Sequence, residues 1–306
     1  MYEVNYISVK QKDGYITKVS HFRSKDIPKA SLLILHGMAE HQKRYYPFIS
    51  YLADQGIDVY CYDHRGHGTD KKIKDLGFFA AEKGYQLVVE DTITVSEYIQ
   101  HNNRCSRLIL MGHSMGSLIA RNVIQTYDNF SLVILSGTTF PSGFLTRAGL
   151  ILSSIIVKCK GARHVSPFMD NLMFGNKKYT MLSDRTSHDW LSRSHTVVGA
   201  YIHDPYCGFI CTASFYHDLL KLVSNASKKK LIQKTKKDLP LYIISGLKDP
   251  VGGYGKEINK YLSVLKKLQF ENVTSKLYPD CRHELINELN KEEVYSDILQ
   301  QIEKNL

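Results

Sequence analysis

The chain has 306 residues, 43% of them hydrophobic, and a formal net charge of +10 at pH 7. This is an ordinary soluble globular composition, long enough for one large domain or for one domain with an insertion. The positive charge would suit nucleic acid or an anionic membrane surface. However, the lysines are spread and no helix-turn-helix, zinc-finger or RNP pattern is present, so we do not expect a nucleic-acid partner.

The cysteines and the apolar runs argue against a secreted or membrane-spanning protein. The six cysteines are scattered without a C-x-x-C pair, which disfavours both a zinc site and a disulfide framework. Residues 1–6 contain no basic segment followed by an apolar one, as a signal peptide would. The longest apolar stretch, residues 148–157, is interrupted by Ser153 and Ser154 and is too short to span a bilayer. We therefore expect a cytoplasmic protein with reduced thiols.

The chain opens with two alternating segments, residues 6–10 and 15–20, joined by Lys12, Asp13 and Gly14, which predict an antiparallel hairpin. After them, continuous apolar runs typical of strands buried on both faces alternate with helical patterns. The expected strands are residues 32–35, 58–62, 108–111, 132–135, 241–244 and 275–278, and the expected helices are residues 45–55, 86–100, 117–124, 256–268 and 291–303. This alternation predicts an α/β fold with a mostly parallel central sheet and helices on both faces.

The alternation of strand and helix fails between residues 139 and 225. That segment is mixed in character, and strands and helices resume after it. We interpret it as a cap inserted over the carboxyl edge of the sheet, not as an independent domain. The predicted organisation is a core in two parts, residues 1–138 and 226–306, with the cap at residues 139–225.

The pentapeptide Gly112-His113-Ser114-Met115-Gly116 stands between a predicted strand and a predicted helix. A turn this tight strains the backbone of its middle residue, and glycines two positions to either side keep the strand and the helix from colliding. The pattern predicts Ser114 as a nucleophile held at the carboxyl edge of the sheet.

A serine nucleophile needs a base to accept its proton and a carboxylate to orient that base. Asp249 and His283 each follow a later strand, in the order serine, acid, histidine that this arrangement requires. Asp280 is an alternative acid, and Glu284 is expected to support the loop. The histidines of the middle segment precede Asp249 and are expected to be surface or cap residues; they are His188, His195, His203 and His217.

The turn after Ser114 offers the N–H of Met115 as an oxyanion donor, and the loop after residues 32–35 offers the N–H of Met38. Four histidines lie on this loop and the next one, namely His36, His41, His64 and His67. They have no i, i+4 pair on a helix, so we expect neither a metal nor a cofactor. Asp63 and Arg65 are expected to tie the two loops together through charge-assisted hydrogen bonds.

Six motifs together resemble the monoacylglycerol lipase and lysophospholipase-like group of α/β-hydrolases. They are residues 36–41 with Arg44 and Tyr45, residues 63–68, residues 112–116, residues 204–206, residues 246–252 and residues 282–284. The resemblance covers nearly the whole chain and implies Ser114, Asp249 and His283 as the triad, Met38 and Met115 as oxyanion donors, and a cap over the site. Ala39 stands where the family commonly has glycine, and Thr69 where it often has serine.

The predicted activity is hydrolysis of a carboxylic ester of a single-chain lipid, such as a monoacylglycerol or lysophospholipid, through an acyl-enzyme. One alternative is a peptidase selective for N-terminal residues, which would need a carboxylate cluster in the cap. Another is a ligand-binding protein with a dead site. Residues 145–157, with flanking basic residues, predict either a cap helix packed on the core or an amphipathic lid that contacts an anionic membrane.

Overall fold

The computed structural model describes residues 3–141, 143–182 and 185–306. Its sheet has eight strands in the order β1-β2-β4-β3-β5-β6-β7-β8. The strands are β1 (Glu3–Lys10), β2 (Ile16–Arg23), β3 (Ala30–Leu35), β4 (Ile57–Tyr62), β5 (Leu108–His113), β6 (Leu132–Ser136), β7 (Leu241–Gly246) and β8 (Val273–Tyr278). β1 and β2 pair antiparallel and β2 also joins β4 antiparallel, whereas the pairs from β4 through β8 are all parallel. The predicted mostly parallel sheet is confirmed.

Helices cover both faces of this sheet. They are α1 (Tyr46–Asp54), α2 (Gly84–Asn102), α3 (Met115–Val123), α4 (Gly143–Lys160), α5 (Pro167–Phe174), α6 (Lys177–Thr180), α7 (His195–His203), α8 (Ala213–Ser227), α9 (Lys229–Ile232), α10 (Lys256–Lys267) and α11 (Lys291–Lys304). One buried apolar cluster joins α1 and α11 to one face, and another joins α2, α3, α8 and α10 to the other. β3, β4, β5 and β6 are buried along their whole length, and their sequences are accordingly mainly apolar.

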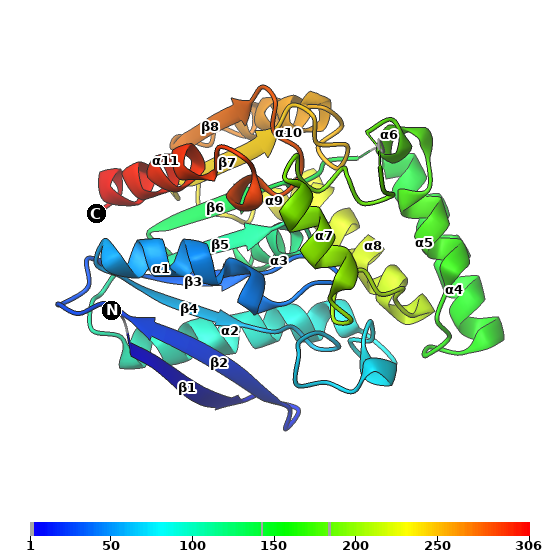
Figure 1. The fold of residues 1–306 in the computed structure, drawn as a ribbon, viewed down its shortest axis with the longest axis horizontal. Coiled ribbons are helices and arrows are strands. Elements are labelled where there is room, and N and C mark those ends of the chain that lie inside the picture. The colour runs from blue at the N-terminus through cyan, green and yellow to red at the C-terminus, as the bar shows by residue number, and fades with distance from the viewer. Residues whose placement is uncertain (1–2, 142, 183–184) are drawn as a thin grey trace.

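The segment between β6 and β7 contributes α4 to α9. We refer to residues 139–225 as the cap. Figure 1 shows α4 and α5 beyond the carboxyl ends of the strands, at the right of the view. α8 packs on α2 and α3 as well as on α4, so the cap is anchored on the core through this helix. In the described parts of the chain, no helix is long and apolar enough to cross a membrane.

Arg121 on α3 ties the two ends of the cap together. Its guanidinium donates to the backbone carbonyls of Thr139, at 2.7 Å, and Ala226, at 2.6 Å, which flank the insertion. It also lies over the ring of Tyr261, 3.9 Å from the centroid. The side chain is buried, and this burial lowers the pKa of Arg121. The bond to the Ala226 carbonyl is buried and the bond to the Thr139 carbonyl is partly buried, so loss of the guanidinium would leave both acceptors poorly satisfied.

We expect Arg121→Met to lower the free energy of unfolding by about 2–4 kcal/mol, because it leaves one buried and one partly buried carbonyl unsatisfied while nearly preserving the volume of the side chain. Urea titrations of the wild type and the variant measure this difference. Arg147→Met, at an exposed position of α4, is the control and should change stability by less than about 0.5 kcal/mol. Equal stability of the two variants would contradict the role of Arg121.

Candidate active site

Ser114 occupies the strained turn between β5 and α3. Its φ of 51° and ψ of −116° lie outside the backbone conformations that residues other than glycine normally adopt. A Cβ on Gly112 would lie 2.3 Å from the carbonyl oxygen of Gly116, and a Cβ on Gly116 would lie 2.2 Å from that of Leu35. Only glycine fits at these two positions, so the strand, the helix and the end of β3 pack closely enough to hold Ser114 in this conformation.

The structure brings Asp249, not Asp280, to the side chain of His283. His283 Nδ1 and Asp249 Oδ2 are 3.0 Å apart, and both residues are buried. They come from the loops after β8 and β7, whose carboxyl ends lie next to each other in the sheet. Asp280 is exposed, and the described residues include no hydrogen bond between it and His283.

The Asp249 carboxylate changes the acidity of His283. Burial alone would lower the pKa of the imidazole, but the negative charge of Asp249 and its hydrogen bond outweigh burial and raise that pKa above its ordinary value. The hydrogen bond also holds the proton on Nδ1, which leaves Nε2 as the basic atom. His283 lines the same cavity as Ser114.

The loop at residues 36–41, which we call the oxyanion loop, is held by Glu40 and Arg44. Glu40 Oε1 accepts a hydrogen bond from the backbone N–H of Gly37 at 2.5 Å and from the Tyr45 hydroxyl at 2.8 Å. Arg44 binds Glu40 at 2.6 Å and also both carboxylate oxygens of Glu284, the neighbour of His283, at 2.6 Å. One largely buried arginine, with a side chain 11% exposed, therefore connects this loop with the histidine loop. The sequence motif contains Glu40 and Arg44, but their joint role was not predicted.

Met38 and Met115, the predicted oxyanion donors, both line the cavity beside Ser114. Neither backbone N–H donates to another group in the described part of the chain. A Cβ built on Gly37 would lie 3.3 Å from Ser114 Cβ, so the oxyanion loop passes directly over the serine. Two unsatisfied N–H groups on either side of a serine are the arrangement that an oxyanion hole requires.

The prediction that Asp63 and Arg65 tie the two loops together is half wrong. Asp63 does so, because its carboxylate accepts from the backbone N–H of Gln42 at 2.7 Å and from the Gln42 amide at 3.1 Å. Arg65 instead pairs with Asp91 on α2 and with Asp13 in the β1–β2 turn, each at 2.6 Å. These two acids are distant in sequence, and no local pattern points to them.

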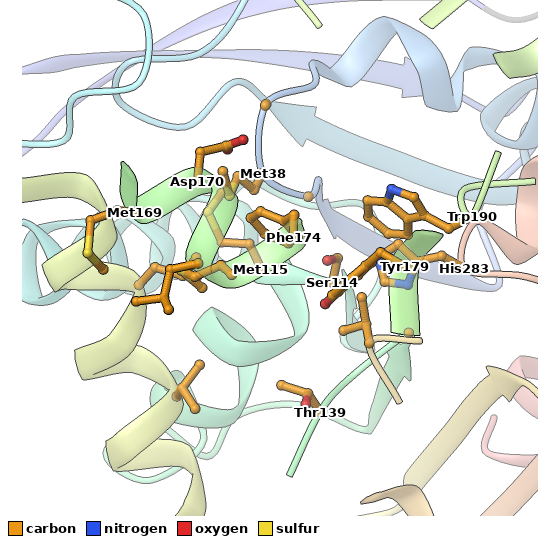
Figure 2. A pocket seen from close by; sticks show the side chains of 18 of the residues that line it. Met38, Ser114, Met115, Thr139, Met169, Asp170, Phe174, Tyr179, Trp190 and His283 are labelled. Carbon is orange, nitrogen blue, oxygen red and sulfur yellow. The ribbon is translucent and has the colours of Figure 1, made fainter. Parts of the chain in front are cut away.

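Ser114 and His283 lie at the floor of a cavity of about 730 Å³ beneath the cap. Figure 2 shows Tyr179 and Trp190 beside His283, and Met115 and Phe174 further along the cavity. The Trp190 ring lies 5.2 Å from that of His283, and its carbonyl accepts from the His283 N–H at 3.3 Å. Trp190, the single tryptophan of the chain, was missed as a site residue because nothing in its local sequence relates it to His283.

The cap aspartates that the structure describes do not form a carboxylate cluster in this cavity. Among those that the structure describes, only Asp170 lines the cavity, where one of its oxygens accepts from the Tyr216 hydroxyl at 2.6 Å. Asp189 binds Arg185 and Thr186, Asp204 binds His41, and Asp218 accepts from the backbone at the start of α2. Asp184 lies outside the described residues.

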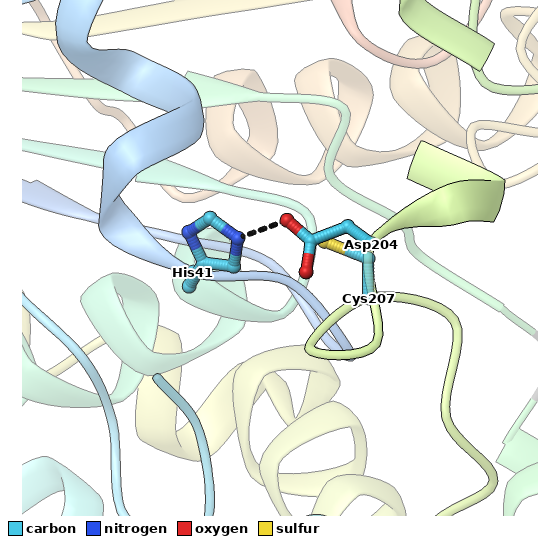
Figure 3. Close-up of side chains that lie close together, drawn as sticks. All are labelled: His41, Asp204 and Cys207. Atoms are coloured by element: carbon cyan, nitrogen blue, oxygen red, sulfur yellow. Dashed lines mark hydrogen bonds and ion pairs between the residues drawn. The ribbon is translucent and has the colours of Figure 1, made fainter. Parts of the chain in front are cut away.

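His41 meets two cap residues that the sequence did not connect with it. Figure 3 shows its ring facing Asp204, with Nε2 and Oδ2 2.8 Å apart, and Cys207 close by. This is the one group in the described chain with three side chains of metal-ligand type close enough to share an ion. However, burial raises the pKa of the Cys207 thiol, and thiols bind metals as thiolates. We interpret the group as a hydrogen-bonded contact between the cap and the oxyanion loop.

Comparison with known proteins agrees with this geometry. A family model described as serine aminopeptidase, S33 matches residues 26–290. The chain belongs to this family. Relatives of this α/β-hydrolase include the monoacylglycerol lipase of Mycolicibacterium smegmatis, which is 25% identical over 91% of the chain and 90% of that protein. The human monoglyceride lipase is 27% identical over 90% of the chain and 82% of that protein.

Solved structures show the same fold. A thermostable carboxyl esterase from Bacillus coagulans, in complex with glycerol, matches with a TM-score of 0.90 and 25% identity, over 98% of each chain. A soluble variant of the monoglyceride lipase from Saccharomyces cerevisiae, in complex with a substrate analog, matches with a TM-score of 0.74 and 18% identity, over 100% of this chain and 97% of that one.

Four buried histidines surround the site of this α/β-hydrolase and are neutral. Burial lowers the pKa of His36 and of His113 to about 4 and that of His67 to about 3, and it holds the pKa of His64 well below its ordinary value. Two of the rings use an unprotonated nitrogen: His36 Nε2 accepts from the His64 N–H at 3.0 Å, and His67 Nε2 accepts from the Ala39 N–H at 3.2 Å. Protonation of these nitrogens would break both hydrogen bonds.

We expect the free energy of unfolding to fall as the pH falls from about 6.5 to about 4.5. Histidines in the unfolded chain titrate near about 6.5, so in this interval the unfolded state binds protons that the four buried rings do not. Their contribution is therefore present above the unfolded pKa and is lost on acidification. His283, whose pKa is raised, takes up its extra proton above about pH 6.5 and hardly opposes this trend within the interval. Asp218, whose pKa burial raises to about 6, does oppose it, as a single group. The slope should therefore approach about three protons.

Urea titrations at a series of pH values measure this slope. His203→Gln, at an exposed position, is the control and should leave the profile unchanged. A flat profile between these pH values would show that the four rings are not kept neutral by the fold.

Proposed function

We propose that this protein is a serine hydrolase that cleaves a carboxylic ester of a single-chain lipid, of the monoacylglycerol or lysophospholipid type, through an acyl-enzyme. The observation that carries the proposal is the hydrogen-bonded pair of His283 and Asp249 beside Ser114, at the floor of a large cavity with a mainly apolar lining. The names of the relatives support it, because they include monoacylglycerol and monoglyceride lipases from a bacterium and from mammals.

Each residue has a definite role in the proposed reaction. Ser114 Oγ attacks the ester carbonyl while His283 Nε2 accepts its proton, and the same proton then passes to the leaving alcohol. Asp249 holds the Nδ1 proton of His283 and stabilises the imidazolium. The N–H groups of Met38 and Met115 donate to the oxyanion. A water molecule, deprotonated by His283, then attacks the acyl-enzyme and releases the fatty acid and Ser114.

The cavity supports a lipid ester over a peptide with a free N-terminus. An ammonium group would need carboxylates that are free to pair with it, but Glu40 and Glu284 are already bound to Arg44. Asp170 is the one cap aspartate of the described residues that lines the cavity. The residues that line the cavity along the cap include Leu145, Leu152, Met173, Phe174, Phe209 and Leu220. Such a surface favours an acyl chain.

We expect Ser114→Ala to remain folded and to lose ester hydrolysis by about 10³- to 10⁶-fold, because the acyl-enzyme route disappears while the oxyanion donors remain. Turnover of a p-nitrophenyl ester measures the loss, and a fluorophosphonate probe should label the wild type at Ser114 and leave the variant unlabelled. Ser263→Ala, at an exposed serine of α10, is the control. Hydrolysis at the wild-type rate by Ser114→Ala would disprove the proposed function.

We expect Asp249→Asn to lower kcat by about 10⁴-fold, because an amide cannot hold His283 in the required tautomer. Asp280→Asn should leave kcat within about twofold, since an exposed carboxylate away from the ring contributes little. Measuring both variants with one ester compares the two acids directly. If Asp280→Asn were the more damaging, the acid of the triad would be Asp280.

A membrane surface is a further part of the proposal. α4 does not present one uniform apolar face: Leu152 and Ile156 pack on the core, whereas Ile151 is 64% exposed and Ile155 is 53% exposed. Phe144 and Phe168, on α4 and α5, are also exposed. Basic residues flank these side chains at Arg147, Lys158, Lys160 and Arg163. We infer that the exposed face of α4 and α5 inserts into a lipid surface while the basic residues contact anionic head groups.

We expect Ser114→Ala protein to co-sediment with vesicles, more strongly when the vesicles carry anionic lipid, and less strongly at high salt because the charged contacts are screened. Ile151→Ser and Ile155→Ser, added to Ser114→Ala, should each weaken binding by about fivefold, since each removes an exposed apolar side chain. Ile27→Ser, at an exposed apolar side chain between β2 and β3, is the control for general effects. Equal binding by all variants would show that the substrate reaches the site from solution.

A further inference from the structure

The oxyanion loop contains a residue in an unfavourable conformation. Ala39, at the position next to Met38, has a φ of 51°, in the left-handed region that favours glycine. A non-glycine residue stays in this region only where its surroundings hold it there. The contacts of Ala39 therefore decide whether the oxyanion loop keeps its shape.

The cap supplies most of these contacts. The carbonyl of Ala39 accepts two hydrogen bonds from the cap: one from the backbone N–H of Gly208 at 2.9 Å and one from the Tyr201 hydroxyl at 3.0 Å. On the core side, the N–H of Ala39 donates to His67 Nε2. The peptide group that precedes Ala39 is thus held by the core, and the peptide group that follows it is held by the cap.

A third contact attaches the cap to the end of the same loop. His41 Nε2 and Asp204 Oδ2 are 2.8 Å apart, and His41 is buried (Figure 3). Asp204 also accepts from the backbone N–H of Tyr206 at 2.8 Å, and its carbonyl accepts from the backbone N–H of Cys207 at 3.0 Å. These bonds shape the turn that presents Gly208 to Ala39. Residues 201–208 therefore hold the oxyanion loop at two points.

We propose that residues 201–208 of the cap position the oxyanion loop, so that the cap contributes to the chemical step as well as to substrate binding. Tyr201, Asp204 and Gly208 are positioning residues in this proposal, acting on Met38 through Ala39 and His41. The proposal rests on the proposed function, in which the Met38 N–H stabilises the oxyanion. A shift of well under 1 Å in the position of the Met38 N–H is enough to lower the rate. This group must reach the oxyanion of the transition state, which does not occupy the position of the ground-state carbonyl oxygen.

The decisive variant is Tyr201→Phe, assayed with p-nitrophenyl acetate. This ester is too short to depend on the acyl-chain contacts of the cap. The variant removes only the hydroxyl that binds Ala39, and keeps the ring over which the Arg44 guanidinium lies at 4.8 Å. We expect kcat to fall by about tenfold, less than the loss of an oxyanion donor itself, with KM changed by less than about twofold.

Tyr216→Phe is the matched control. Its hydroxyl is equally buried and donates at 2.6 Å to another cap residue, Asp170, but it does not contact the oxyanion loop. It should leave kcat for the short ester within about twofold. Asp204→Asn tests the second attachment point and should lower kcat in the same way. Thermal melts of all three variants identify any loss of folded protein. Because Tyr201 and Asp204 hold the loop at separate points, the test does not depend on a single variant.

Ala39→Gly distinguishes a positioning role of Tyr201 from a general effect on the structure. Glycine adopts a positive φ without strain, so a loop with glycine at position 39 should depend less on the cap. We therefore expect Tyr201→Phe to cost about threefold or less in kcat in the Ala39→Gly background. An equal loss in both backgrounds, or full kcat of Tyr201→Phe with Ala39, would overturn the proposal.

Ser114→Ala, run in parallel, separates this proposal from the proposed function. If Ser114→Ala is inactive and Tyr201→Phe has full kcat, the positioning role fails alone. If Ser114→Ala retains activity, the proposed function fails, and the positioning proposal fails with it.

Discussion

The close packing of backbone at the end of β5 is the constraint on which the site depends. β5, the start of α3 and the end of β3 meet where Gly112 and Gly116 leave no room for a Cβ. This packing forces Ser114 into its strained conformation, and the strain is tolerated because the buried parallel strands on both sides cannot move apart. The same contact sets the distance between Ser114 and the oxyanion loop, which begins where β3 ends.

A buried polar network connects the oxyanion loop with the loop that carries His283. Arg44 joins Glu40 of the oxyanion loop to Glu284 beside His283; both carboxylates are buried and the arginine side chain is largely so. Charges buried in this way are costly unless they are paired, so the three groups hold one another in place. Among the neutral histidines nearby, His36 and His67 accept hydrogen bonds from backbone N–H groups without adding charge. The site thus combines one fully paired ionic cluster with uncharged rings.

The cap has two different relations to the core. At its ends, Arg121 fastens it to α3, and along α8 it shares the apolar core. Nearer the site, it reaches the oxyanion loop through polar contacts at Tyr201, Asp204 and Gly208. Exposed apolar side chains lie on α4 and α5. In the proposed mechanism, substrate access and catalytic geometry therefore depend on different parts of one insertion.

The sequence by itself determined the strands of the sheet, five of the helices that flank it and the pair of strand ends that bring Asp249 to His283, because continuous apolar runs and glycine spacing act locally along the chain. It also pointed to Ser114, since the turn is formed by five consecutive residues. Only the tertiary structure decided the partners of Arg65, the position of Trp190 against His283 and the contact between His41 and Asp204. These pairs are separated by many residues, and which of several similar acids or rings meets which partner depends on how the cap and the loops pack in space.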